Sequence, residues 1–347
     1  MICLSDNNLI ELTDILSEYA LPKFKVKEIN KWLLNGYKFD EMTNIDKTTR
    51  EKLKGEFSDI PIEILKSYTS VDGTIKLLYK LADGNLIEGV LMSYEYGNTL
   101  CISSQVGCRM GCVFCASTMN GLERNLTAAE MLGQVSVTNR FVGGNFSSRK
   151  ITNVVLMGSG EPLDNYDNVV KFLELISSES SLNVSRRNIS LSTCGLVPNI
   201  KRLADDNLGV TLTISLHNPF DDERKEIMPI AKSYSVKELI DAARYYFDKT
   251  GRRVVFEYTL IKGVNDTEKY AVELSKILKG FPNHINCIIY NEVKGKSLTP
   301  PTRKDGYRFC EMLEKLNMSA TLRRQMGVDI EGACGQLKRR FEEGDEI

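Results

Sequence analysis

The fold of this chain is constrained most by a regular alternation of short apolar segments with longer amphipathic segments over residues 98–325. The short segments, such as ITNVVLM and VTLTISL, have the length and the β-branched residues of buried strands. The longer segments, such as SVKELIDAARYYFDKT, repeat apolar residues at helical spacing, and LTAAEMLGQVSVTNRF opens with a capping box from Thr127 to Glu130. Strands that alternate with helices form a parallel sheet, either open or closed into a barrel. We therefore expect an α/β fold.

Two different patterns precede this alternation. Residues 1–70 show helical spacing in LTDILSEYA, KFKVKEINKWLL and DKTTREKLKGEF, which predicts a small helical domain. Residues 71–97 carry the strand-like segments TIKLLYKL and LIEGVLMSY on either side of the turn signal ADGN, which predicts a β-hairpin. The expected organisation is a helical domain, a hairpin linker, a main domain over 98–325 and a C-terminal segment over 326–347.

The composition is that of an ordinary soluble globular protein, with 42% hydrophobic and 26% charged residues. The sequence contains no run of about eighteen apolar residues. Its first residues, MICLSDNNLIELTDIL, lack the basic and apolar pattern of a signal peptide. We expect a cytoplasmic protein that does not contact a membrane.

The formal net charge of −1 gives no sign of a polyanionic partner, so any nucleic-acid binding must come from local patches. Between Leu21 and Lys54 there are nine Lys or Arg residues and five Asp or Glu residues, a local excess of four positive charges. Such an excess is typical of a solvated helix face or of a small RNA-docking module. The segments SRRN (185–188), LRRQ (322–325) and LKRR (337–340) are further candidates for phosphate contacts, or else solvated edges.

The stretch CISSQVGCRMGCVFCAS holds four of the nine cysteines, and Cys108, Cys112 and Cys115 within it have the spacing C-x3-C-x2-C. In a cytoplasmic protein such a group indicates metal binding or catalysis rather than disulfides. A structural zinc site is closed by four ligands, but the sequence has no second C-x2-C pair, and its only histidines are His217 and His284. Three thiolates instead suit a [4Fe–4S] cluster whose fourth iron stays open to a small molecule.

This cysteine spacing, with Phe114 directly before the last cysteine, resembles the radical S-adenosylmethionine (SAM) enzymes. The resemblance implies a partial (β/α)6 barrel, one [4Fe–4S] cluster held by Cys108, Cys112 and Cys115, and SAM bound to the open iron. The segment MGSGEPL resembles the Gly-Glu-Pro element of these enzymes, which meets the amino group of the cofactor. A dinucleotide-binding loop is a poorer match, because Leu163 takes the place of the last glycine of G-x-G-x-x-G.

Further segments narrow the resemblance to the RlmN/Cfr family of RNA adenine methyltransferases, and they run from about Lys23 to Leu337. They are ERNLTAAE, LSTCGLVP, SLHNPFDDERKEIMPI and RRQMGVDIEGACGQL. The resemblance implies as substrates an adenine of 23S ribosomal RNA at the peptidyl-transferase centre and the adenine next to the anticodon in tRNA. It also implies an electron donor of the flavodoxin or ferredoxin type, and it favours RNA docking as the role of the basic N-terminal helices. We expect a monomer, because no coiled-coil heptads occur.

The family resemblance gives catalytic roles to two further cysteines and a glutamate. Carbon C2 of adenine is electron-poor, so it does not attack a methyl sulfonium, whereas a carbon radical can add to it. By resemblance, Cys334 accepts a methyl group from one SAM molecule, and a second SAM molecule supplies the radical that activates this methyl group. Glu88 then accepts the ring proton, and Cys101 attacks the sulfur of Cys334, which leaves a transient Cys101–Cys334 disulfide.

Each of these three residues also has an ordinary structural reading. Without the resemblance, Cys334 would be a small apolar residue of a terminal loop, and Cys101 a half-buried strand residue. Glu88 would most often face solvent, but its apolar neighbours in LIEGVLM favour burial. Burial raises the pKa of a carboxyl group towards the value that a base needs at neutral pH.

The residues that the resemblance assigns to cofactor binding lie at or just past the ends of predicted strands. They are Gly160, Glu161, Ser192, Ser215, Leu216, His217 and Asn291. A β/α barrel displays its ligands at the C-terminal ends of its strands, so this placement agrees with the assignment independently. Taken alone, His217 would be a structural histidine.

Two residues favour methylation of C2 over C8. Val106 stands where Cfr proteins carry a second cysteine, and Pro162 follows the glutamate where Cfr proteins carry alanine. The alternatives are a Cfr-like C8 methyltransferase of 23S rRNA, which would confer antibiotic resistance, and a radical SAM enzyme with a non-RNA substrate, which would not need Cys101 and Cys334. A third alternative, a zinc-bound RNA-binding module without catalysis, is disfavoured by the count of three clustered cysteines.

Overall fold

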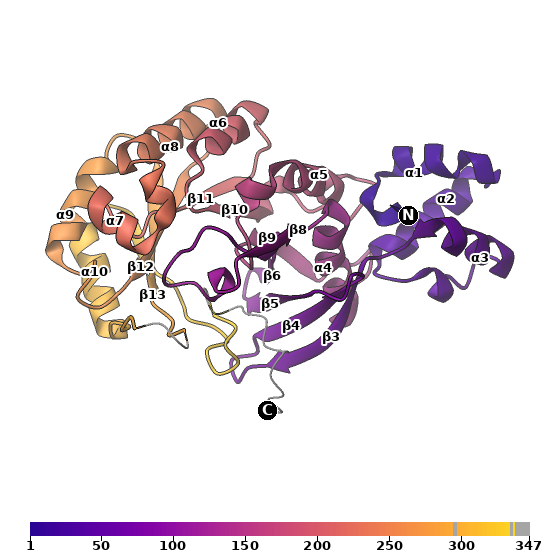
Figure 1. Ribbon diagram of the computed structural model, residues 1–347, viewed down its shortest axis with the longest axis horizontal. Helices are drawn as coiled ribbons and strands as arrows, with labels where there is room; N and C mark the ends of the chain where they lie inside the picture. Colours follow the sequence, from indigo (N-terminus) through magenta and orange to yellow (C-terminus); the bar gives the residue numbers. More distant parts are fainter. Residues whose placement is uncertain (294–296, 334–335, 337–347) are drawn as a thin grey trace.

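The computed structural model describes the chain except for residues 294–296, 334–335 and 337–347, so Cys334 lies outside the described residues. Ten strands of the described part form one sheet in the order β14-β13-β12-β11-β10-β9-β6-β5-β4-β3 (Figure 1). Seven neighbouring strands of this sheet run parallel to one another. They are β6 (Gly97–Ile102), β9 (Ile151–Leu156), β10 (Ile189–Thr193), β11 (Thr211–Ser215), β12 (Val254–Leu260), β13 (Asn283–Ile289) and β14 (Ala320–Leu322). The expected α/β fold with a parallel sheet is confirmed.

The two faces of the parallel sheet differ in polarity, as the alternation of side chains along a strand requires. Leu191, Leu212 and Phe256 point to the helix-covered face and are fully buried. The residues next to them, such as Ser192 and Thr213, point to the inner face and line cavities. The inner face therefore leaves room for ligands, while the outer face makes the core.

The outer face is covered by the helices that connect successive parallel strands (Figure 1). They are α4 (Ala128–Phe141), α5 (Tyr166–Ser177), α6 (Val197–Asp206), α7 (Asp221–Ile227), α8 (Val236–Thr250), α9 (Glu268–Ile277) and α10 (Arg303–Lys315). The capping box predicted at the start of α4 is present. The side chain of Thr127 accepts a hydrogen bond from the backbone N–H of Glu130, and the Glu130 carboxylate accepts one from the backbone N–H of Thr127. Among the described residues we find no helix with both the length and the apolar character of a membrane span.

The predicted hairpin extends the sheet with antiparallel strands. Strand β4 (Ile75–Leu81) pairs with β5 (Leu86–Tyr94), and β5 pairs with β6. A third antiparallel strand, β3 (Ile62–Thr69), pairs with the other side of β4. The helical part of the chain therefore ends before residue 70, because the last residues expected in it belong to the sheet.

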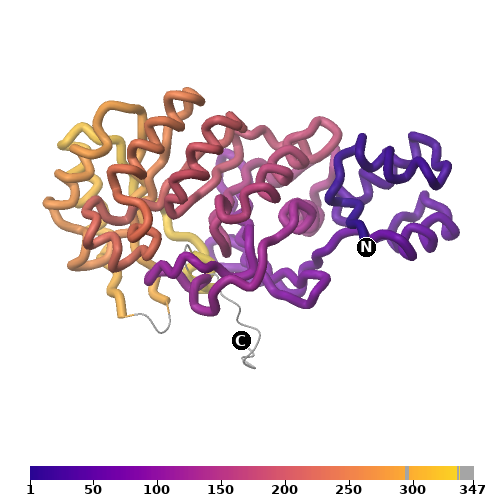
Figure 2. The backbone as a smooth tube through the Cα atoms, turned by 45° about the horizontal axis from the view of Figure 1, so that its top comes forward, coloured from indigo at the N-terminus to yellow at the C-terminus, as the bar shows by residue number. Residues whose placement is uncertain are grey.

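The N-terminal helices lie at one end of the molecule, next to α4 and α5 (Figures 1 and 2). They are α1 (Leu9–Ile15), α2 (Lys23–Leu34) and α3 (Lys47–Glu56), and the two-residue strands β1 (Ile2–Cys3) and β2 (Phe57–Ser58) pair beside them. Asp6 accepts a hydrogen bond from the backbone N–H of Ala129 at 2.9 Å and pairs with Lys171 at 3.1 Å. Buried residues of these helices belong to the same hydrophobic cluster as those of the sheet, so one continuous core joins the two parts.

Candidate active site

A cavity opens at the C-terminal ends of the parallel strands. Among its lining residues are the three cysteines of the C-x3-C-x2-C motif, Cys108, Cys112 and Cys115. The cavity is also lined by six residues that the family resemblance assigned to cofactor binding. They are Gly160, Glu161, Ser192, Ser215, His217 and Asn291. Residues that are far apart in the sequence therefore meet at one site.

The cysteine loop connects the short strands β7 (Gln105–Gly107) and β8 (Leu122–Asn125), which pair antiparallel. The backbone N–H of Cys108 donates to the carbonyl of Gly121 at 2.9 Å and closes the loop at its base. Inside the loop, the hydroxyl of Thr118 donates to the carbonyls of Cys112 and Cys115 at 3.1 and 3.0 Å. These bonds fix the backbone that carries the three thiols.

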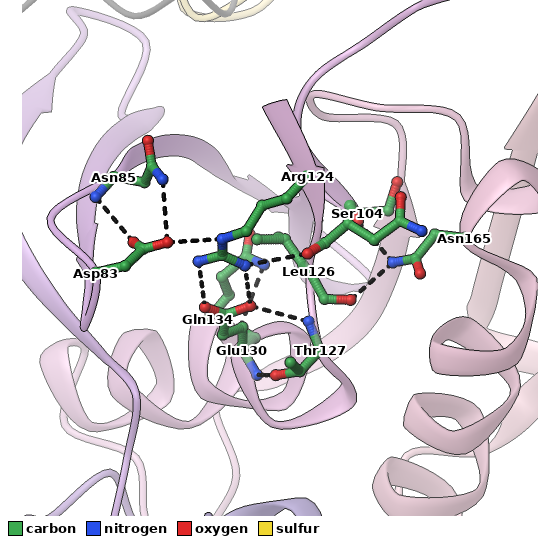
Figure 3. A network of polar contacts seen from close by, with 10 residues as sticks. Asp83, Asn85, Ser104, Arg124, Leu126, Thr127, Glu130, Gln134 and Asn165 are labelled. Carbon is green, nitrogen blue, oxygen red and sulfur yellow. Dashed lines mark hydrogen bonds and ion pairs between the residues drawn. The ribbon is translucent and has the colours of Figure 1, made fainter. Parts of the chain in front are cut away.

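A network of ionic contacts anchors the returning strand of this loop (Figure 3). Arg124 on β8 donates to both carboxylate oxygens of Glu130 at 2.8 and 2.9 Å, and to Asp83 in the β4–β5 turn at 2.7 Å. The amide of Asn165 donates to the carbonyls of Ser104 and Leu126, both at 2.8 Å. The cysteine loop is thus held between the hairpin extension, the start of α4 and the segment before α5.

The thiols of the loop lie in an environment that opposes an unpaired negative charge. Burial raises the pKa of Cys108 to about 12. The pKa of Cys112 is raised by its burial and further by the neighbouring Cys115 and Cys108. Nearby cations, such as iron ions, would stabilise the thiolate forms of Cys108 and Cys112.

Three thiols that line one cavity fit an iron–sulfur cluster. Within the described residues, no three His, Cys, Asp or Glu side chains converge closely enough to hold one metal ion. In an iron–sulfur cluster each thiolate binds a different iron, so the three sulfurs must face one shared cavity. Cys108, Cys112 and Cys115 meet that condition.

Glu161 supplies a buried carboxylate to the cavity wall. Its two oxygens accept hydrogen bonds from the backbone N–H groups of Leu163 at 3.0 Å and Cys194 at 2.7 Å. Burial nevertheless raises the pKa of Glu161, because the hydrogen bonds do not fully offset the loss of water. A bound ammonium group would stabilise the charged carboxylate, so the site fits the amino group of SAM.

Gly160 has no room for a side chain. Its φ is +110°, and a Cβ atom there would lie 2.7 Å from the backbone nitrogen of Gln105 and from the hydroxyl of Ser104. Gln105 also accepts a hydrogen bond from the backbone N–H of Glu161 at 2.8 Å. The glycine therefore lets the chain turn tightly and bring Glu161 to the cavity.

His217 follows β11 and joins the strand end to the cysteine loop. Its ring lies edge-on to Phe114, with ring centroids 4.7 Å apart. Its Nδ1 accepts a hydrogen bond from the backbone N–H of Thr259 at 2.9 Å, and burial lowers the pKa of His217 to about 3. His217 is therefore a neutral imidazole. Leu216, which the resemblance also assigned to cofactor binding, is buried beneath the site and does not line the cavity.

A second cavity shares a wall with the first, because Cys115, Met157 and Asn291 line both. Cys101 and Ala333 line this second cavity. Two adjoining cavities therefore lie between the cysteine loop, Cys101 and Ala333, which directly precedes Cys334 in the sequence.

Glu88 does not line either of these two cavities, but it lies on the same face of β5 as Val90, which lines the second one. Val90 is paired with Cys101 in the sheet register. The carboxylate of Glu88 is buried and lies 3.1 Å from the ammonium nitrogen of Lys76, which is buried as well. Glu88 is therefore a buried, ion-paired carboxylate two positions along the strand from the cavity that contains Cys101.

Two buried polar residues of the site were not predicted from the sequence. Arg224 on α7 is fully buried and donates to the carbonyls of Leu216, Cys194 and Ser215 at 3.0, 2.8 and 3.1 Å. Gln105 holds the Glu161 backbone, as described above. Arg224 falls within the motif SLHNPFDDERKEIMPI, but its charged neighbours gave no sign that this one side chain points inward.

Two family models match the chain. The radical SAM superfamily matches residues 102–274, and the ribosomal RNA large subunit methyltransferase N-terminal domain matches residues 2–58. Together the two matches span the helical part and most of the β/α part.

Full-length relatives are similar as well. Proteins of Clostridium novyi and of Clostridium perfringens strain 13, both named probable dual-specificity RNA methyltransferase RlmN, are 50% and 49% identical to this chain over 336 and 339 residues. The alignments cover 96% and 97% of this chain and 96% of each relative. The crystal structure of a radical SAM methyltransferase from Sphaerobacter thermophilus is 40% identical, has a TM-score of 0.92, and is matched over 97% of this chain and 99% of that chain.

Proposed function

Because the chain belongs to the RlmN family of radical SAM methyltransferases, we propose that it methylates carbon C2 of adenine in RNA. One target is an adenine of 23S ribosomal RNA at the peptidyl-transferase centre. The other target is the adenine next to the anticodon in tRNA. The observation that carries this proposal is the pair of adjoining cavities, one lined by the three cysteines and the other by Cys101 and Ala333. A methyl relay through Cys334 requires that the cofactor, the resolving cysteine and the methyl-bearing segment share one space.

The enzyme uses a [4Fe–4S] cluster and SAM, as radical SAM enzymes do. When bound, these cofactors supply the methyl group and the one-electron chemistry that activates it. We assign Cys108, Cys112 and Cys115 to the cluster. We assign the six cavity-lining residues to SAM, with the carboxylate of Glu161 facing its amino group, and we assign to Leu216 a supporting position beneath the SAM site. Two SAM molecules are consumed in each turnover.

The protein supplies the methyl carrier, the base and the resolving thiol. Cys334 carries the methyl group as S-methylcysteine and joins it to the adenine ring. Glu88 accepts the ring proton, and the ammonium group of Lys76 stabilises the deprotonated carboxylate that a base needs. Cys101 then attacks the sulfur of Cys334, so that the methylated RNA leaves and a disulfide remains.

Val106 and Pro162 favour C2 as the methylated carbon over the Cfr-like C8 alternative. The enzyme works as a cytoplasmic monomer that receives electrons from a flavodoxin or ferredoxin. The basic helices α2 and α3 dock the RNA, and the main chemistry takes place in the β/α part.

Analysis of the nucleosides made by the enzyme tests this proposal. The anaerobically purified protein is incubated with SAM, a reductant and a 23S rRNA fragment or a tRNA, and the digested RNA is examined by mass spectrometry. We expect 2-methyladenosine. A yield of 8-methyladenosine would instead support the Cfr-like alternative, and unmodified RNA together with cofactor turnover would point to a substrate other than RNA.

Two variants test whether Cys101 and Glu88 act after the RNA has become joined to the protein. Cys101→Ser and Glu88→Gln should stop turnover after the RNA has become joined to the protein, because product release needs both the proton transfer and the attack on Cys334. Denaturing gels should show an RNA–protein adduct for these variants. Cys3→Ser, a substitution of a partly exposed cysteine in the N-terminal part, should leave turnover and release unchanged.

A further inference from the structure

We infer that a groove on the inner face of the sheet, beside Tyr94 and Tyr96, binds the nucleotides that flank the target adenine. The tyrosines stack on bases, and arginines of the groove contact phosphates. The inference rests on the proposed function, because it names how that same site holds its RNA. The groove is formed by the inner faces of strands β5, β6 and β9 to β14, on the side of the sheet opposite to the helices.

The rings of the two tyrosines are stacked on each other and offer an aromatic surface on which bases can stack. Their ring centroids are 4.9 Å apart and their planes differ by 8°. Tyr96 is 70% exposed and lies in the turn after β5, whereas Tyr94 is half-buried. The bases of single-stranded nucleic acids stack on exposed aromatic side chains beside such grooves.

The charge of the groove suits a polyanion. Among its described lining residues are three arginines and one acidic residue, Glu257. Arg187 and Arg324 are exposed, while Arg323 lies 3.8 Å from the carboxylate of Glu257. These arginines come from two segments far apart in the sequence, SRRN and LRRQ, and the fold brings them to one groove. A local positive excess of this kind binds phosphates although the whole chain is nearly neutral.

The groove leads to the proposed reaction site. Tyr94, Arg324 and Met157 line both the groove and the cavity that contains Cys101, and that cavity shares a wall with the cofactor cavity. A nucleotide strand in the groove can therefore place one base next to Cys101 while its neighbours stay on the tyrosines. RNA enzymes that act on a base take it out of its stack in this manner.

RNA binding by the anaerobic holoenzyme tests the inference. The probe is a fluorescent anticodon stem-loop RNA, whose dissociation constant is measured by anisotropy at several salt concentrations. Tyr96→Ala should weaken binding roughly ten-fold, the loss expected for one stacked base. Tyr96→Phe should bind like the parent enzyme, because it keeps the aromatic face. Arg324→Gln should lower the slope of log affinity against log salt by roughly 0.7, the value for one phosphate contact on a single strand.

Tyr307→Ala is the matched control, because Tyr307 is also an exposed tyrosine beside an arginine, Arg303, but lies on α10 outside the groove. Methylation of Cys334, which needs no RNA, is measured in every variant. If the parent enzyme methylates Cys334 and binds RNA, yet Tyr96→Ala binds as tightly as Tyr307→Ala, the inference is wrong and the proposed function stands. If the parent enzyme neither methylates Cys334 nor binds RNA, the proposed function itself fails.

Discussion

His217, a buried residue of the site, makes the free energy of unfolding depend on pH. Its pKa is lowered by burial to about 3, against an ordinary value of 6.5. The unfolded chain therefore binds the proton more readily than the folded chain between these two values. The contribution to stability is complete above pH 6.5 and is lost as the pH falls through that window, by about 1.4 kcal/mol per pH unit.

We predict that His217→Asn makes the unfolding free energy less sensitive to acid. The amide oxygen of asparagine can accept the Thr259 hydrogen bond in place of Nδ1, but the side chain does not titrate. Between pH 6.5 and pH 5.5, the parent protein should lose about 1 kcal/mol more than the variant, as measured by urea unfolding. Parallel losses in the two proteins would contradict this account of His217.

At the scale of residues, the sequence was most informative where spacing imposes a shared role. Cys108, Cys112 and Cys115 were grouped by their spacing and the strand-end residues by motif and position, and the structure brings both groups to one cavity. Arg224 was not found, because an arginine in a charged helix normally faces water. Only the fold shows that its guanidinium lies between the ends of β10 and β11 and donates to the carbonyls there.

The β7–β8 hairpin depends on a glycine that cannot be replaced. Gly107 has a φ of +76°, and a Cβ atom there would lie 2.0 Å from the carbonyl oxygen of Gly121. Gly121 has a similar φ of +69° but no neighbouring atom within 4 Å of a Cβ position. The two positions thus share backbone strain and differ only in crowding.

We predict that Gly107→Ala lowers the iron content of the purified protein severely, because the hairpin must open next to Cys108. Gly121→Ala should retain most of its iron, since it adds only the left-handed strain of about 1–2 kcal/mol. Iron and sulfide analysis after anaerobic purification measures the difference. Equal iron contents in the two variants would show that the hairpin does not set the cysteine geometry.

The C-terminal segment is fastened to the turn between β3 and β4. The carboxylate of Asp329 accepts hydrogen bonds from the hydroxyl of Ser70 and from the backbone N–H of Val71, and Asp72 accepts one from the N–H of Gly327 at 3.0 Å. Met326 packs with Cys101 in a small hydrophobic cluster. These contacts fix the chain shortly before Cys334.

We predict that Asp329→Asn loosens this segment and slows release of the methylated RNA. Hydrogen exchange of the peptide over residues 326–333 should become faster, because the charged acceptor of two hydrogen bonds is lost. Asp305→Asn is the control, since Asp305 accepts from the hydroxyl and the backbone N–H of Thr302 in the same way, at the start of α10. Unchanged exchange in Asp329→Asn would mean that other contacts hold the segment.

At the scale of elements, the periodic segments were predicted well and the weakly patterned ones were not. The parallel strands and their helices were recognised because one face of each is buried. Strand β3 was assigned to the helical part, because it lies at the edge of the described sheet and most of its residues are at least partly exposed. Strands β7 and β8 are only three and four residues long, too short to show a period.

The whole molecule combines a continuous core with a connected set of hollows on the inner face of its sheet. The core joins the N-terminal helices to the β/α part, so the basic helices keep a fixed position relative to the site. These adjoining hollows are lined by the three cysteines, by Cys101 and by Tyr94. The sequence could not show this connection, because the shared walls come from strands that meet only in the folded chain.

The central claim, a methyl relay through Cys334, is tested most directly by the mass of the peptide that carries this residue. The protein is purified anaerobically, incubated with SAM and a reductant without RNA, and digested for mass spectrometry alongside its visible spectrum. The account predicts iron–sulfur absorbance together with a methyl group on Cys334. A protein that holds its cluster but leaves Cys334 unmethylated after this incubation would contradict the relay, while leaving the radical SAM fold intact.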